Sequence, residues 1–202
     1  MVVWMTEERD EVQEIVSRAR SGDMAAFEEL YRSHQAGIFT FIRSQVRHRE
    51  ITADLTQETF VRAWESLPRL REPGAFRGWL HRIAANLVRD EVKSGRSRLE
   101  VTESTLLGDS ETPQQEAPAP ESDGPEQRLV DGEMSRHIWA ALEDLSEEHR
   151  AAVVMHHMEG MSVEEIAQAM GVRPGTIMSR LSRAREALRN RLSRYVEEGS
   201  DD

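Results

Sequence analysis

The sequence contains no cysteine among its 202 residues, which excludes disulfides, thiolate metal sites and thiol nucleophiles. It also contains no apolar run near the ~20 residues that a membrane span requires. Residues 1–20 lack the apolar core of a signal peptide. These absences predict a soluble, cytoplasmic protein.

The formal net charge of −11 taken alone argues against a nucleic-acid-binding protein. The charge is nevertheless unevenly distributed. Counting Lys and Arg against Asp and Glu gives +5 for residues 69–98 and +6 for residues 173–194, in an otherwise acidic chain. Each basic segment coincides with an amphipathic helical pattern, which favours phosphate contact over simple solvation of the two helices.

Residues 99–128 separate the two basic segments and carry four prolines and many acids. Their few apolar residues cannot offset the entropy of ordering, so this segment is predicted to be a flexible linker. The sequence therefore predicts an all-α protein with a first helical domain over 1–98, a second over 129–196 and an acidic tail over 197–202.

Apolar residues recur at helical spacing through the first domain. One stripe runs from Phe27 to Ile42, a second helix carries Leu55, Phe60, Val61 and Trp64, and a third runs from Phe76 to Val88. Gly95 is a plausible stop signal for that third helix. Its outer side carries one acid-free row at i, i+4, i+7 and i+11: Arg82, Asn86, Arg89 and Lys93.

Residues 160–189 have the pattern of a helix-turn-helix. Ser162 and Glu165 form a capping box, Gly171 permits a sharp turn, and Pro174 suits a first helical position. The second helix of such a module places its N-terminal turns in the DNA major groove, where Arg reads guanine and hydroxyls bond phosphate or base edges. The candidate DNA-contacting residues are Arg173, Thr176, Ser179, Arg180 and Arg183.

The chain resembles the extracytoplasmic-function (ECF) sigma factors of bacterial RNA polymerase, group IV of the sigma-70 family. Four ordered segments carry the resemblance: FEELYRSH (27–34), DLTQETFVRAW (54–64), FRGWLHRIAANLVRD (76–90) and EIAQAMGVRPGTIMSRLSRAREAL (165–188). It implies a region 2 domain and a region 4 domain without a region 3. It also implies a specificity subunit rather than an enzyme, and neither a cofactor nor a bound metal is expected.

The resemblance also implies roles for particular residues. Asp54, Gln57 and Glu58 would bind core RNA polymerase, and Trp64 would pack inside. The helix bearing Asn86 would read and open the −10 element, because an amide can pair with the edge of a flipped base. Arg173 to Arg183 would lie in the −35 major groove. An anti-sigma protein is a further possible partner.

Two positions depart from the family pattern. The acidic run that usually precedes LTQE is reduced to Glu50 and Asp54. One hypothesis is that phosphorylation of Thr52 restores negative charge to this segment. Met178 stands where the family commonly has Lys or Arg, so a different −35 preference is expected.

Two other classes of function are weaker alternatives. A two-domain transcription regulator would use the helix-turn-helix but would need no polymerase-binding or strand-opening segment over 54–90. An enzyme or metalloprotein using the seven histidines is poorly supported, because no histidine pair at i, i+4 has an acidic partner.

Overall fold

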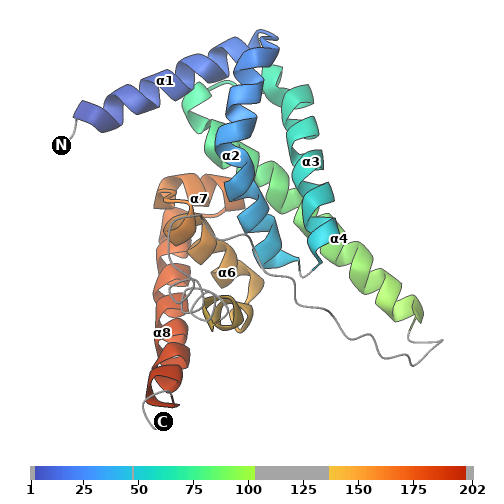
Figure 1. The fold of residues 1–202 in the computed structure, drawn as a ribbon, viewed down its shortest axis with the longest axis vertical. Helices are drawn as coiled ribbons and strands as arrows, with labels where there is room; N and C mark the ends of the chain where they lie inside the picture. The colour runs from blue at the N-terminus through green and yellow to red at the C-terminus, as the bar shows by residue number, and fades with distance from the viewer. Residues whose placement is uncertain (1–2, 47, 103–136, 199–202) are drawn as a thin grey trace, which may run out of the picture.

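The computed structural model describes residues 3–46, 48–102 and 137–198, and within these residues the fold is entirely helical (Figure 1). The prediction of an all-α fold is thus confirmed. Among the described residues, no helix is long and apolar enough to cross a membrane. Most of the predicted linker, residues 103–128, lies outside the described residues.

The first domain is built from four helices. These are α1 (Val3–Arg20), α2 (Met24–Gln45), α3 (Arg49–Ser66) and α4 (Phe76–Thr102), with the short turns η1 (Leu67–Arg69) and η2 (Pro73–Ala75) between the last two. Leu30, Ile38, Phe60 and Leu80 are among the buried side chains at the centre. Trp64 packs against Phe27, with ring centroids 4.9 Å apart, as the sequence predicts. Each helix buries one apolar stripe, so its opposite face remains available for partners.

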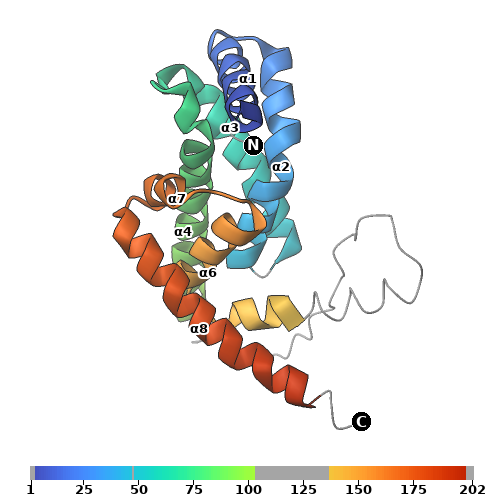
Figure 2. The same cartoon turned by 90° about the vertical axis from the view of Figure 1, so that its left-hand side faces the viewer.

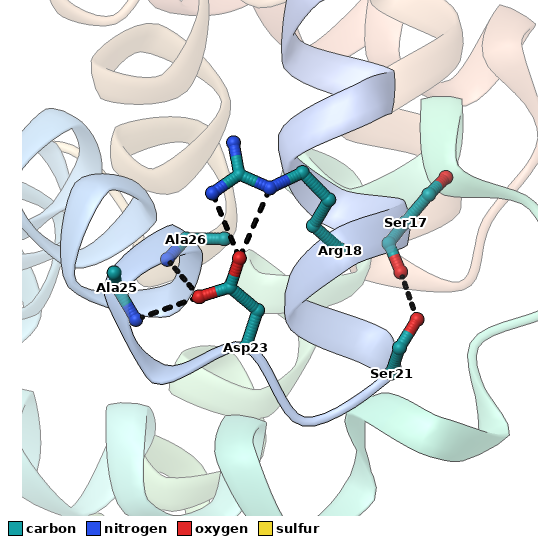
Figure 3. Close-up of polar contacts among 6 residues, drawn as sticks. All are labelled: Ser17, Arg18, Ser21, Asp23, Ala25 and Ala26. Carbon is teal, nitrogen blue, oxygen red and sulfur yellow. Dashed lines mark hydrogen bonds and ion pairs between the residues drawn. The ribbon is translucent and has the colours of Figure 1, made fainter.

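A tight corner joins α1 to α2 (Figure 3). Asp23 caps α2, since its Oδ1 accepts from the backbone nitrogens of Ala25 and Ala26 at 3.0 and 3.1 Å. Its Oδ2 accepts from Nε and Nη2 of Arg18 at 3.0 and 2.7 Å. The backbone hydrogen bonds and the Arg18 guanidinium together hold the pKa of the Asp23 carboxyl below its usual value. The corner therefore orients α1 while it begins α2.

Three features of this domain differ from the sequence-based expectation. Helix α1, which buries Val16 and Ala19, was not predicted. Helix α4 continues through Gly95 to Thr102, so the predicted stop at Gly95 is wrong and the first four positions of the predicted linker are helical. Val61 was counted with the apolar positions of its helix but is 52% exposed.

The second domain begins with a helical segment at residues 137–143, followed by α6 (Glu147–Val153). Ser146 caps α6, whose chain continues as one π-helical turn, η3 (Val154–Met158). The domain ends with α7 (Val163–Met170) and α8 (Pro174–Glu198). Its core includes Leu142, Val154, Ile166 and Ile177.

The two domains pack against each other through one continuous apolar cluster. Helix α7 crosses α4, and α6 with η3 lies beside α2, as both views show (Figures 1 and 2). His34 of α2 lies near this junction, where its ring meets the ring of Phe76 edge-on at 5.3 Å. Its Nδ1 donates to the backbone oxygen of Leu30 at 3.0 Å.

The stability of the fold is expected to depend on pH through His34. Burial is the main cause that lowers the pKa of its imidazole, and the charges of Arg77 and His81 lower it further, although the hydrogen bond to the Leu30 backbone and the charge of Glu159 oppose them. The contribution of neutral His34 to the stability is therefore fully present above 6.5, the ordinary pKa of histidine. This contribution is lost as the pH falls through the lowered pKa of the folded state.

We expect the melting temperature of the wild-type chain to fall more steeply between pH 7 and pH 5 than that of His34→Phe, which keeps a ring but cannot titrate. Circular dichroism melting curves at both pH values measure the difference. Equal slopes for the two proteins would contradict the assignment.

Candidate nucleic-acid interface

Helices α7 and α8 form a helix-turn-helix as the sequence predicts. Ser162 accepts from the backbone nitrogen of Glu165 at 3.2 Å, and the Glu165 carboxylate accepts from the backbone nitrogen of Ser162 at 2.8 Å. Gly171 ends α7 with a φ of 66°, a left-handed conformation that glycine adopts without strain. Helix α8 then begins at Pro174, packs against α6 and α7, and buries Ile177 and Leu181. The N-terminal turns of α8 are thereby fixed by packing on one side and free on the other.

The outer face of α8 presents hydroxyl groups and cations to solvent. Four of the five predicted −35 residues are exposed, Arg173 just before α8 and the other three on it: Thr176, Ser179 and Arg183. Met178 is 58% exposed on the same part of the helix. This surface therefore has the composition and accessibility that major-groove contact needs.

Arg180 is placed differently from the other four predicted residues. Its side chain is only 13% exposed, and its Nη2 lies 2.5 Å from the Glu148 carboxylate of α6. Arg191, whose side chain is 40% exposed, forms a more solvated ion pair with Asp144 at 2.9 Å. The Arg180 ion pair therefore connects α8 to α6, and in this structure the Arg180 guanidinium does not join the exposed face.

The second basic segment lies on α4, in the other domain. Arg82, Asn86, Arg89 and Lys93 are all exposed, so the predicted row faces solvent. Nη1 of Arg89 donates to the Asn86 amide oxygen at 2.9 Å, which leaves the amide NH₂ as a donor. The neighbouring positions Leu80, Ala84 and Leu87 are buried, and they fix the orientation of the row.

Helix α3 exposes a face that is part acidic and part apolar. Asp54 and Gln57 are exposed, and Glu58 forms an ion pair with Arg62 at 2.7 Å. Val61 lies one turn further along the same face. An exposed valine beside carboxylates favours contact with another protein over contact with a nucleic acid. Its exposure could not be predicted from the sequence, because a valine at helical spacing usually belongs to the core.

Thr52 cannot take the role suggested for it. Its side chain is completely buried, and its hydroxyl donates to the backbone oxygen of His48 at 2.9 Å. A kinase could reach this hydroxyl only if α3 unfolded, so the phosphorylation hypothesis is wrong for the folded protein.

His156 and His157 of the second domain contact protein groups in the folded chain. Nδ1 of His156 lies 2.8 Å from the backbone oxygen of Met161, and the ring packs against that of His157. Within the described residues, no three His, Asp or Glu side chains are grouped so that they could hold a metal ion.

Comparison with known protein families finds two matches in this chain. The family model "Sigma-70 region 2" matches residues 30–98, and "Sigma-70, region 4" matches residues 135–188. One match lies within each helical domain, and together they contain the predicted polymerase-binding, −10 and −35 residues.

Curated proteins similar to this chain include ECF sigma factors. The chain is 38% identical to the ECF RNA polymerase sigma factor SigE of Mycolicibacterium smegmatis over 88% of this chain and 67% of that protein. It is 31% identical to the ECF RNA polymerase sigma-E factor of Haemophilus influenzae, over 89% of this chain and 94% of that protein.

Two solved structures share the fold. One is CnrH in complex with the cytosolic domain of CnrY, with a TM-score of 0.64 and 26% identity over 90% of this chain and 97% of that chain. The other is the sigma factor RpoE in complex with the anti-sigma factor NepR from Bartonella quintana. Its TM-score is 0.65, with 23% identity over 83% of this chain and 96% of that chain.

The helix-turn-helix, the exposed basic row on α4 and the matches over both domains lead to one assignment. The chain belongs to the ECF sigma factors of the sigma-70 family, the non-catalytic subunits that direct bacterial RNA polymerase to specific promoters.

Proposed function

We propose that this sigma factor divides promoter recognition between its two domains while α3 binds core RNA polymerase. The observation that carries the proposal is the presence of two exposed basic helix faces in separate domains, one on α4 and one on α8. Domain limits of 1–98 and 129–196 and a cytoplasmic location, where core polymerase works, belong to the same proposal.

The N-terminal turns of α8 would read the −35 element. Arg173 and Arg183 would supply charge, while Thr176 and Ser179 would bond phosphates or base edges. Because Met178 is exposed and uncharged, this face would differ in base preference from a face with Lys or Arg there. Arg180 would act as a positioning residue through Glu148.

The row on α4 would engage the −10 element. Arg82, Arg89 and Lys93 would neutralise phosphates, and Asn86 would pair with the edge of an extruded base. Base extrusion costs only a few kcal/mol, which protein contacts can supply. Strand separation at the −10 element would therefore require no covalent catalysis by the sigma factor.

Run-off transcription with core RNA polymerase and a library of randomised promoters tests the function. We expect the full chain to direct transcription from a subset of promoters that share a −35 and a −10 sequence. Core polymerase alone is the control. Transcripts no more selective than those of the control would contradict the proposal, and DNA binding without transcription would favour the two-domain regulator instead.

We expect Arg183→Ala to weaken binding of the holoenzyme to the selected promoter by about 1–3 kcal/mol if Arg183 reads a base. The slope of log K against log salt should fall by about 1 if it contacts a phosphate. Fluorescence anisotropy across a salt series measures both quantities.

Arg180→Ala is the matched comparison. It should lower the melting temperature through loss of the Glu148 ion pair and should change the salt slope less than Arg183→Ala does. An unchanged affinity and slope for Arg183→Ala would place Arg183 away from the DNA.

The α3 face would bind core polymerase through Asp54, Gln57 and Glu58, with Val61 as an apolar contact. We expect Val61→Ser to weaken core binding by up to about 1.5 kcal/mol, roughly tenfold, because an apolar contact is lost. Val12→Ser on α1 is a matched control, since Val12 is also exposed. Equal core affinity for the two variants would remove Val61 from the interface.

An anti-sigma partner remains a prediction for this chain. The complex of RpoE with NepR involves a protein that shares the fold, and co-purification of the full chain from its own cells would identify a partner if one exists.

A further inference from the structure

The N-terminal turns of α8 expose one large side chain, and it is apolar. Met178 is 58% exposed, whereas the other exposed side chains between residues 174 and 182 are small: Pro174, Thr176, Ser179 and Ser182. Gly175 adds no side chain, and a Cβ at that position would meet nothing within 4 Å. Met178 is therefore the side chain of this segment with the longest reach toward a partner.

The one cation between residues 174 and 182 is held by the protein itself. Nη2 of Arg180 lies 2.5 Å from the Glu148 carboxylate, and its Nη1 lies 3.8 Å from the sulfur of Met170 on α7. Bidentate contact of an arginine with O6 and N7 of guanine is the commonest base-specific contact in the major groove. In this structure, residues 174–182 present no exposed guanidinium for such a contact.

Met178 and Arg183 lie on different flanks of the exposed face. Successive residues of an α-helix are rotated by about 100°, so the two side chains project about 140° apart around the axis of α8. Arg185 and Arg189 follow Met178 at i+7 and i+11, are exposed, and share its flank. These two cations would anchor that flank on phosphates, while Met178 and Arg183 would meet different base pairs.

The chemistry of methionine selects one group in the major groove. A thioether has no hydrogen-bond donor and is only a weak acceptor, so it gains little from the polar edge of a base. It is unbranched and polarisable, and it adapts to irregular apolar surfaces. Thymine alone among the four bases presents an apolar group in the major groove, its 5-methyl. Burial of Met178 in the groove is therefore most favourable against a thymine methyl.

We propose that Met178 reads the 5-methyl group of a thymine in the −35 element, an inference that rests on the proposed function of α8. Apolar contact then replaces hydrogen-bond readout at one position and favours an A·T pair there. The small side chains of Ser179 and Ser182 allow the helix axis to approach the base edges closely enough for this contact. Arg180 stays with Glu148 and leaves the position to Met178.

Replacement of thymine by deoxyuridine removes the methyl and keeps every hydrogen-bonding group of the base. Each thymine of the −35 element in the selected promoter is replaced in turn, on either strand. Fluorescence anisotropy then measures binding of the full chain with core polymerase. We expect one position at which the replacement lowers wild-type affinity by about fourfold, the effect of burying one methyl-sized group. At that position, 5-methylcytosine should bind more tightly than cytosine, because it returns the methyl to the same place.

Substitutions of Met178 assign the methyl effect to this side chain. Met178→Ala should no longer distinguish thymine from deoxyuridine, whereas Met178→Leu, which keeps an apolar side chain of similar size, should retain the difference. Met24→Ala is the matched control, because Met24 is an exposed methionine of the other domain, and it should also retain the difference. Circular dichroism melting curves establish that each variant is folded.

The outcomes separate the role of Met178 from the proposed function. Selective transcription by the wild-type chain, with no thymine replacement that changes its affinity, would overturn the role of Met178 alone. A −35 element without an A·T pair would do the same. A methyl effect that persists in Met178→Ala would also overturn this role, because another side chain then reads the methyl. Absence of selective transcription by the wild-type chain would overturn the proposed function, and the role of Met178 with it.

Discussion

Burial of one apolar stripe on each helix is the constraint on which the other features of this sigma factor depend. Leu30, Phe60 and Leu80 have to face a common core, and this fixes the rotation of α2, α3 and α4 about their axes. The faces left outside are then determined as well. The exposed basic row on α4 and the exposed acidic and apolar face of α3 therefore owe their directions to buried side chains on the opposite side of each helix.

The same constraint explains which features could be predicted from the sequence. A period of 3.6 residues is a local property, so the stripes of α2, α3 and α4 and the Ser162–Gly171–Pro174 pattern predicted helices and a helix-turn-helix correctly. The direction of the basic row followed from the same periodicity. Helix α1 was missed, although Val16 and Ala19 are buried, because its stripe is narrow and much of its sequence is charged.

Features that depend on contacts between distant residues could not be predicted in this way. Arg180 has the helical position of a DNA contact, but Glu148, 32 residues earlier, engages its guanidinium. His81 and Glu159 are 78 residues apart, and neither carries a local signal that they meet. Gly95 shows the converse error, because a residue with low helix propensity is tolerated where the rest of the helix is favourable. Periodicity assigns a side chain to a face, while long-range contact decides what that face does.

The π-helical turn η3 makes the segment before the helix-turn-helix tolerant of a change in length by one residue. The backbone nitrogen of Glu159 donates to the oxygen of Val154 at 3.2 Å, so the wider turn closes at the residue that enters the domain contact. A π turn holds one residue more than an α turn, and successive residues of an α-helix are rotated by about 100°. Loss of a single residue from η3 would therefore convert the π turn to an α turn and leave the direction of Glu159 toward His81 nearly unchanged. A chain one residue shorter at this point could keep both folds and also the way in which they meet.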